Sequence, residues 1–593
     1  MRSLPLVRFY STFRRYAGVR LPVLVLMMTV GGLIEGAGVG VFVPLLSVGS
    51  VGEGQGHVIS RVAEGVLEFF GSEPTLNALL VLILAIFLLK GLVSLAQSAV
   101  TAHIMATLTY DIRTGLVTLL ESTAYRNFVG LNTGFLNNAV TVESLRAVAC
   151  FGHYANTLVA LIYSVAYGLL ALVVDPRGAL LVTVLGVAGA SAIGVLHRIS
   201  HEYSVLTSAA NARLQSLFIE TIQAFKYLRA TNSFPVLITK VNTQVRRLAT
   251  YVFRLSLVTG GLKSVGEPVG VVILVTVLFV NVSVLGRPLV DVLVLAFVFF
   301  RLMGKLMAVQ ANWQKFSATL GSLEAVEEAS NLIGREPDPD GTVKLDGFSD
   351  RIELRDVGFH YGDRQVLCEV NIELRKNSTV AIVGKTGAGK STVVNLLLGL
   401  LPPTSGEILF DGTEYGAIEL ASLRRLFGYV TQEDVIFSDT IANNVSLWAC
   451  DDGDGECLER VARAVREVHA DDFVADTPDG LQTVLGDRGS TLSGGQRQQL
   501  QIARELFKDP EILVFDEATS SLDAKSEWAI QQSLDEWKGR RTLVIVTHRL
   551  SVVRGCDYVY VMDEGRVVEQ GRFEELHAKD ESKFAELARL QGL

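Results

Sequence analysis

The sequence predicts an all-α membrane domain of six spans, fused to a second, α/β domain that contains a phosphate-binding loop. Hydrophobic residues make up 49% of the 593 residues and the mean hydropathy is +0.37, which is high for a soluble protein. Apolar runs of membrane-spanning length lie before about residue 310, whereas later segments alternate between strand-like and helix-like patterns. We place the membrane domain at residues 1–333, a turn-rich linker at 334–349 and the α/β domain at 350–593.

The first domain contains apolar runs that are long enough to cross a bilayer as helices. A span needs about 20 residues at about 1.5 Å each to cover about 30 Å of hydrocarbon. The six runs cover about residues 21–46, 75–102, 155–174, 178–196, 251–285 and 288–308. Several continue into polar segments with helical periodicity, so we expect these helices to extend well into the cytoplasm. Buried helices of a soluble protein would not explain runs of this length.

Loop charges predict the orientation of these spans. Five arginines and no acidic residue precede the first run, and segment 197–250 has seven Lys and Arg residues against two acidic ones. Such loops stay on the cytoplasmic side of a membrane. We therefore expect a multi-pass protein of the cell (inner or plasma) membrane, with both termini and the α/β domain in the cytoplasm.

Charged residues also lie within or near the ends of the apolar runs. A charge at mid-membrane costs roughly 2.5–3.5 kcal/mol on insertion scales, so it should face a wet cavity or find a partner. In one interpretation they line a central polar path, in which Arg301 and Lys90 hold an anionic group. In the other they are structural ion pairs, for instance Glu267 with Arg301, or they snorkel near a helix end. The six are Glu35, Lys90, Lys263, Glu267, Arg301 and Lys305, and the candidate substrate contacts among them are Glu35, Lys90, Glu267 and Arg301.

The second domain contains a phosphate-binding loop of the form G-x-x-x-x-G-K-[ST]. Its glycines let backbone N–H groups approach phosphate oxygens, its lysine can reach the β- and γ-phosphates, and its serine hydroxyl can ligate Mg²⁺. A β-branched run at 379–383 precedes the loop and a leucine-rich helix follows it, so a helix N-terminus faces the phosphate. The loop reads Gly384-Lys385-Thr386-Gly387-Ala388-Gly389-Lys390-Ser391-Thr392.

Further polar residues follow predicted strands of the same domain. Asp516 and Glu517 end the apolar run 512–515, where Asp516 can hold Mg²⁺ and Glu517 can orient or deprotonate an attacking water. His548 follows the strand 542–547, at the edge of a parallel sheet where ligands bind, and can hydrogen-bond a γ-phosphate. Tyr361, upstream of the phosphate loop, can stack on a nucleobase.

A second candidate phosphate site opens the helix that runs through Arg504. A serine and two glycines at a helix start form an anion-binding N-terminus. Two phosphate sites on one domain suggest that nucleotide is shared across a dimer. The segment reads Leu492-Ser493-Gly494-Gly495-Gln496.

These motifs, together with Ser521-Leu522-Asp523, resemble those of ATP-binding-cassette transporters of the exporter type, as a half-transporter with its membrane domain first. The resemblance implies a domain-swapped homodimer in which ATP lies between the phosphate loop of one subunit and the signature, 492–496, of the other. It also implies that Tyr361 packs on adenine, that Gln432 contacts Mg²⁺ and senses the membrane domain, and that Glu517 is the catalytic carboxylate. Segments 125–133 and 224–234 are similar to the two coupling helices of the family.

We therefore expect ATP-driven export or flipping, with ATP and Mg²⁺ as cofactors. Segments 34–44 and 300–303 resemble parts of lipid-linked oligosaccharide and glycolipid flippases, which points to an amphipathic lipid with an anionic head group. Multidrug or peptide export and an ATP-gated channel or regulator stay open as alternatives. The net charge of −9 gives no sign of nucleic-acid binding. The five cysteines lack metal-ligand spacing, and most lie in the cytoplasmic half, so we expect no disulfide framework.

Overall fold

The computed structural model describes most of the chain and divides it into two units. One unit is Met1–Thr123 with Gly130–Arg335, and the other is Ala124–Val129 with Glu336–Leu593. The described residues are 18–41, 75–131, 133–174, 213–284, 289–334, 340–451, 453–486, 489–518, 524–579 and 582–590, with scattered positions between them.

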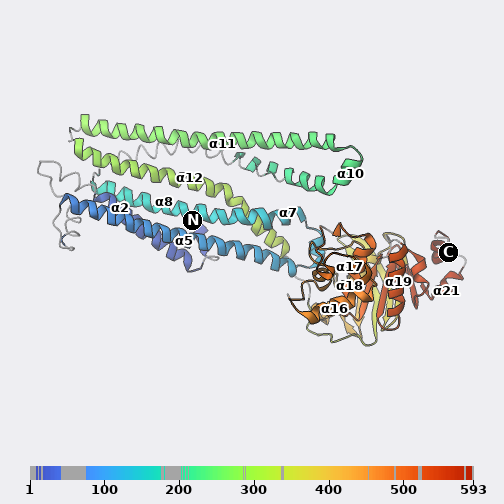
Figure 1. Cartoon of the computed structure of the whole chain (residues 1–593). Helices are drawn as coiled ribbons and strands as arrows, with labels where there is room; N and C mark the ends of the chain where they lie inside the picture. The colour runs from blue at the N-terminus through green and yellow to red at the C-terminus, as the bar shows by residue number, and fades with distance from the viewer. Residues whose placement is uncertain are drawn as a thin grey trace. The chain divides into compact units, whose positions relative to one another are not determined.

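The first unit is built from long helices (Figure 1). The longest have 46 residues, which corresponds to about 69 Å at 1.5 Å per residue and exceeds the hydrocarbon thickness of a bilayer more than twofold. The predicted extension of the helices beyond the membrane is therefore present. The helices are α2 (Arg20–Gly40), α5 (Leu76–Glu121), α7 (Thr133–Asn138), α8 (Ser144–Val174), α10 (Phe225–Ala230), α11 (Phe234–Phe279) and α12 (Leu289–Ile333), with π-helical turns at Ala139–Glu143 and Val280–Val284.

Three helices of the described part are long and apolar enough to cross a membrane: α2, α5 and the stretch Gly134–Val173. One face of α5 is apolar and exposed, as a lipid-facing surface requires, since Leu84, Leu88, Leu92 and Leu95 are each at least 60% exposed. The predicted runs at 251–285 and 288–308 fall largely on α11 and α12. The predicted run at 178–196 lies outside the described residues, apart from one position.

Small residues let α2 approach its neighbours closely. A Cβ atom at Gly31 would lie 2.7 Å from both the Gln97 amide nitrogen and the Tyr163 hydroxyl, and one at Gly38 would lie 2.9 Å from Ile86. Such contacts need glycine, as is usual where membrane helices pack tightly. Helix α2 therefore packs closely against both α5 and α8.

The second unit contains two sheets. The larger has the order β10-β9-β3-β8-β7-β6, in which all neighbours except β9 and β10 pair in parallel. Strands β3 and β8 are buried at every residue, which explains their continuous apolar sequence. The strands are β3 (Thr379–Gly384), β6 (Phe427–Val430), β7 (Ile512–Asp516), β8 (Thr542–Thr547), β9 (Tyr558–Asp563) and β10 (Arg566–Gly571); the smaller antiparallel sheet contains β1 (Arg351–Tyr361), β2 (Arg364–Arg375), β4 (Ser405–Phe410) and β5 (Thr413–Glu414).

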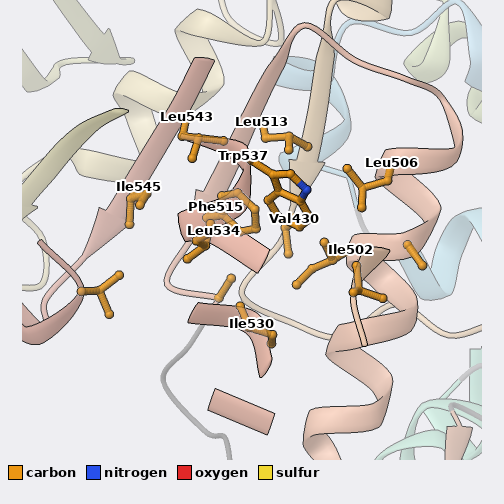
Figure 2. Packing of buried hydrophobic residues seen from close by; sticks show 14 of the residues in the cluster. Val430, Ile502, Leu506, Leu513, Phe515, Ile530, Leu534, Trp537, Leu543 and Ile545 are labelled. Atoms are coloured by element: carbon orange, nitrogen blue, oxygen red, sulfur yellow. The ribbon is translucent and has the colours of Figure 1, made fainter. Parts of the chain in front are cut away.

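Helices pack on the larger sheet and bury its apolar side chains. Figure 2 shows Phe515 of β7 and Ile545 of β8 in one cluster with Ile502 of α18 and Trp537 of α19. The Phe515 and Trp537 rings stack with centroids 6.4 Å apart. The α-helices of the second unit are α6 (Tyr125–Val129), α13 (Lys390–Leu397), α14 (Leu420–Arg425), α15 (Ile441–Ser446), α16 (Gly455–Glu467), α17 (Asp471–Ala475), α18 (Gly494–Phe507), α19 (Ala524–Trp537), α20 (Leu550–Val553), α21 (Phe573–His577) and α22 (Lys583–Leu590).

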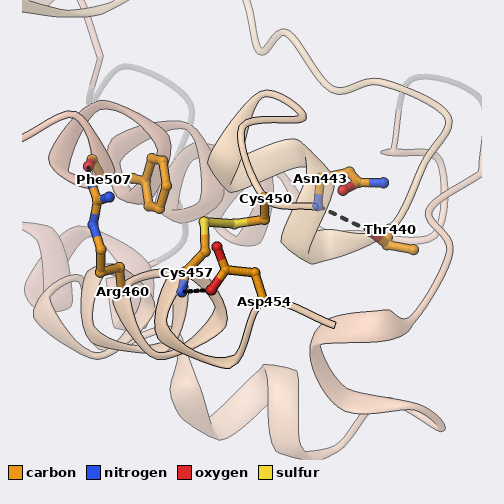
Figure 3. Close-up of a disulfide and its surroundings, with 7 residues drawn as sticks. All are labelled: Thr440, Asn443, Cys450, Asp454, Cys457, Arg460 and Phe507. Atoms are coloured by element: carbon orange, nitrogen blue, oxygen red, sulfur yellow. Dashed lines mark hydrogen bonds between the residues drawn. A yellow bond between two sulfur atoms is a disulfide. The ribbon is translucent and has the colours of Figure 1, made fainter. Parts of the chain in front are cut away.

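One expectation about the cysteines is wrong, because Cys450 and Cys457 form a disulfide (Figure 3). The turn between α15 and α16 includes Gly453 with φ of 90°, and Asp454 caps α16 by accepting from the Cys457 backbone N–H. The two Cα atoms consequently lie 5.5 Å apart, within the usual range for a disulfide. The expectation came from the predicted compartment, whereas the pairing follows from this local geometry.

Candidate functional site

The phosphate loop connects the end of β3 to the start of α13. Gly387 and Gly389 have φ angles of 85° and 99°, which favour glycine over any residue with a side chain. The Lys390 ammonium donates to the carbonyl oxygens of Gly384 and Lys385, at 3.0 and 3.1 Å. Burial lowers the pKa of Lys390, and the carboxylates of Glu517 and Asp516 oppose this effect. The loop therefore presents its only buried cation beside two acidic side chains.

Asp516 lies at the end of β7 and is only 6% exposed. Its Oδ2 atom accepts a hydrogen bond from the Tyr429 hydroxyl at 3.3 Å, whereas Oδ1 is buried without a hydrogen-bond partner among the described residues. Burial raises the pKa of Asp516, and hydrogen bonds from Tyr429 and Ser391 oppose the rise. A carboxylate oxygen beside a serine hydroxyl fits Mg²⁺, which takes few protein ligands and keeps phosphate oxygens and waters. Ser391 and Asp516 are thus the residues that can hold this ion.

Glu517 is the point at which the predicted catalytic residues meet. Its Oε2 atom accepts from the Gln432 amide at 3.1 Å, and its Oε1 atom lies 3.5 Å from His548 Nδ1 and 3.8 Å from Lys390 Nζ. The backbone of Glu517 has a φ of 50°, an uncommon conformation that concentrates at functional sites. A carboxylate held between an amide, an imidazole and an ammonium group can orient or deprotonate a water molecule.

The signature segment forms the start of α18. Ser493 accepts a hydrogen bond from the Gln496 backbone N–H at 3.2 Å, and the Gln496 side chain accepts from the Ser493 N–H at 2.9 Å. This reciprocal cap holds the glycines between them at the helix start. Within the described residues of one chain, no hydrogen bond or ion pair joins Ser493 or Gln496 to the phosphate loop. Residues 521–523 of the third motif lie outside the described residues.

Tyr361 ends β1 and remains 40% exposed. Its ring lies nearly perpendicular to that of Phe359, with centroids 4.8 Å apart, and its exposed part can accept a nucleobase. The predicted first coupling segment forms the short helix α6, and its Tyr125 packs on the apolar core of the second unit. The predicted second coupling segment forms α10, where Phe225 and Tyr227 are 58% and 67% exposed.

One face of α18 holds residues that the motifs did not reveal. Arg497, Gln501 and Arg504 follow one another at helical spacing and bind Asp434, Thr431 and the Val435 carbonyl oxygen, respectively. These partners lie on both sides of Gln432 in the chain, at 431 and at 434–435. The side chains therefore link the segment around Gln432 to the helix that carries the signature. Their spacing was visible in the sequence, but their partners were not.

Tyr429 is a further residue that the sequence did not reveal. It lies on β6, next to β7, and its hydroxyl contacts the Asp516 oxygen opposite the unpartnered one. Burial and the neighbouring Asp516 carboxylate raise the pKa of Tyr429, so the phenol stays protonated and donates. Tyr429 is thus placed to orient Asp516 through Oδ2, which would leave Oδ1 available to a metal ion.

Replacing Tyr429 by Phe should weaken the binding of Mn²⁺, a spectroscopic substitute for Mg²⁺, by about fivefold. A single hydrogen bond contributes about 1 kcal/mol, which corresponds to that factor. Electron paramagnetic resonance titration with ATP measures the affinity directly. Tyr560→Phe is the matched control, because its hydroxyl binds the backbone of Glu373 instead. An unchanged Mn²⁺ affinity in Tyr429→Phe would contradict the positioning role.

Two of the charged residues in the apolar runs, Lys90 and Lys305, lie against a third, Glu35. Its Oε1 atom accepts from the Tyr167 hydroxyl at 2.8 Å and lies 3.2 Å from Lys90 Nζ and 3.5 Å from Lys305 Nζ. The Arg301 guanidinium lies 5.4 Å from the centroid of the Phe297 ring. The suggested pair of Glu267 with Arg301 cannot be followed, since the Glu267 and Lys263 side chains are outside the described part. Lys90 is therefore an ion-pair partner as well as a candidate contact.

Comparison with known proteins identifies similar families, relatives and structures. Two family models match: "ABC transporter transmembrane region" over residues 39–307 and "ABC transporter" over residues 367–520. The "Heterocyst differentiation ATP-binding protein HepA" of Nostoc sp. is 30% identical over 462 residues, which cover 77% of this chain and 75% of that protein.

Two further relatives are each named "ATP-dependent lipid A-core flippase". The protein of Syntrophus aciditrophicus is 40% identical over 44% of this chain, and that of Vibrio vulnificus is 38% identical over 50%. The matches span 43% and 50% of those flippases. The solved "Structure of a bacterial Atm1-family ABC exporter with ATP bound" has a TM-score of 0.77 over 97% of this chain and 99% of its own, at 22% identity, which shows a common fold.

Proposed function

Because the chain belongs to the ABC transporter family and is a multi-pass membrane protein, we propose that it hydrolyses ATP to export or flip an amphipathic lipid with an anionic head group across the cell membrane. The observation that carries the catalytic half is the convergence of Lys390, Gln432 and His548 on Glu517, beside Asp516. The relatives named as lipid A-core flippases support a lipid as the cargo.

In this proposal each residue around Glu517 has its own role in ATP hydrolysis. Lys390 leaves the carbonyl oxygens of the loop for the β- and γ-phosphates, and Ser391 and Asp516 hold Mg²⁺, with Gln432 beside them. When bound, Mg²⁺ neutralises charge on the phosphate oxygens. Glu517 accepts a proton from the attacking water, and His548 hydrogen-bonds the γ-phosphate.

We also propose a homodimer, in which the signature of one copy closes the ATP site of the other. Each unit shows exposed aromatic and apolar side chains that a second copy would cover. In the first unit these are Phe225 and Tyr227, and in the second they are Phe437, Trp448 and Val484, between 36% and 67% exposed. Closure of two nucleotide-binding domains on ATP, with α6 and α10 as coupling helices, would then shift the membrane helices between inward- and outward-facing states. Both termini lie in the cytoplasm in this arrangement.

The deciding experiment uses the full chain in sealed vesicles that contain a fluorescent lipid with a phosphate head group. ATP should drive net transfer of this lipid between leaflets against its gradient. Passive flux that needs only ATP binding would instead favour the channel alternative. Transfer of a drug or peptide probe without lipid transfer would favour the multidrug or peptide alternative.

Replacing Arg301 by Ala should abolish the stimulation of ATPase activity by an anionic lipid. Arg301 supplies a guanidinium on α12 one helical turn before Lys305, and an anionic head group needs such a cation in a low-dielectric path. ATPase assays in nanodiscs across a lipid series measure the effect. Arg254→Ala is the matched control, since Arg254 also packs on an aromatic ring, that of Tyr203. Stimulation that survives in Arg301→Ala would reject this contact.

A further inference from the structure

Three helices of the first unit bring polar groups to a single carboxylate on a fourth. Glu35 comes from α2, Lys90 from α5, Tyr167 from α8 and Lys305 from α12. The three donors all lie within 3.5 Å of the same oxygen, Oε1. The other oxygen, Oε2, is buried and has no hydrogen-bond partner among the described residues. The Glu35 carboxylate is therefore shared by three donors and is not the partner of a single one.

The cluster holds more positive than negative charge. Lys90 and Lys305 contact Glu35, and Arg301 lies four residues before Lys305 on the same face of α12. Among the described side chains this sums to three positive charges against one negative charge. Charge at membrane depth is costly unless it is compensated. A second anion would thus be stabilised here.

The lysines are accessible, whereas the carboxylate is not. Lys90 and Lys305 keep 25% and 28% of their side chains exposed, and Glu35 keeps only 2%. The Lys305 ammonium also lies 4.6 Å from the centroid of the Tyr163 ring, which holds it without neutralising its charge. An anion that enters from the exposed side can reach both ammonium groups, while Glu35 stays behind them.

We infer that Glu35 is an internal counter-ion of Lys90 and Lys305. During transport an anionic head group replaces Glu35 as the ionic partner of the two lysines. This inference rests on the proposed lipid transport and specifies its substrate class: a head group with two negative charges, such as a phosphate monoester. During occupancy Glu35 keeps its hydrogen bond from Tyr167. As the head group leaves, Glu35 pairs with the lysines again, so release does not expose uncompensated cations. By competing for the lysines, the Glu35 carboxylate thus weakens the binding of the head group enough for the lipid to be released in each transport cycle.

The test compares Glu35→Gln with the wild-type full chain in nanodiscs. Short-chain phosphatidic acid is the probe, and short-chain phosphatidylcholine is the neutral comparison. Removal of the competing carboxylate should lower the half-maximal concentration of phosphatidic acid for ATPase stimulation by about tenfold, the lower end of measured couplings between close charge pairs. Direct binding of a fluorescent phosphatidic acid should shift by a similar factor. The response to phosphatidylcholine should not shift.

Two further variants separate charge from structure. Lys305→Gln should raise the half-maximal concentration about tenfold, and Glu35→Gln with Lys305→Gln should return it near the wild-type value, because the balance of charge is restored. If Glu35→Gln does not fold, an unchanged half-maximal concentration in Lys305→Gln still overturns the inference, because the head group would then not bind Lys305. A wild-type protein that responds to no lipid would overturn the proposed function. A wild-type response with no shift in these variants would overturn the counter-ion role alone.

Discussion

Replacing Glu517 by Gln should lower the ATPase rate by about 100- to 10,000-fold, the usual contribution of a positioned general base. The amide keeps the size of the side chain but cannot accept a proton from water. Lys390, Ser391 and the glycines of the phosphate loop are unchanged, so ATP should still bind. The variant should therefore accumulate as an ATP-bound dimer, which size-exclusion chromatography with light scattering measures together with the rate of phosphate release.

Glu511→Gln is the matched control for this change. Glu511 lies in the same unit and accepts hydrogen bonds from the Phe348 N–H and from Lys376, away from the phosphate loop. We expect its turnover to stay within a small factor of the wild-type rate. Turnover near that rate in Glu517→Gln itself would show that the base is another residue. A stable monomer with ATP bound would contradict the shared site.

Replacing Arg504 by Ala should lower the free energy of unfolding of the second unit by about 3–5 kcal/mol. Arg504 is 5% exposed and donates to the carbonyl oxygens of Val435 and Asn444, both at 2.7 Å, and to the Asn444 side chain at 3.1 Å. Burial lowers the pKa of this guanidinium. Its removal takes three hydrogen bonds from these acceptors, among them the carbonyl oxygen of the fully buried Asn444, and calorimetry of the full chain should detect the shift.

Arg460→Ala provides the comparison within the same unit. Arg460 is exposed, packs on the Phe507 ring at 4.6 Å and donates to one carbonyl oxygen at 3.3 Å. The expected cost is about 1 kcal/mol, since one hydrogen bond and one exposed cation–π contact are lost. Equal losses of unfolding free energy in the two variants would mean that the hydrogen bonds of Arg504 contribute no more to stability than the contacts of an exposed arginine.

The arrangement at Glu517 could be anticipated from local patterns. The phosphate loop after β3, the carboxylates at the end of β7 and the histidine after β8 each lie within a few residues of a recognisable apolar run. Parallel strands bring their carboxyl ends to one edge of a sheet, so these residues were expected to meet. Tyr429 escaped notice because its role depends on a neighbouring strand that contributes only a hydroxyl group. Arg504 escaped notice because its acceptors are mainly backbone carbonyl oxygens, which every sequence contains.

The sequence by itself determined the two kinds of domain, the chemistry of the phosphate loop and the presence of charge at membrane depth. Periodicity and motif spacing express these features within short segments of chain. Only the tertiary structure decided that Glu35 pairs with Lys90 and Lys305, and that Tyr167 donates to the same oxygen. The physical reason is that contacts between long helices depend on how each is rotated and how closely it packs. The glycines of α2 let this helix pack closely against α5 and α8, and this role can be recognised only when the positions of those two helices are known.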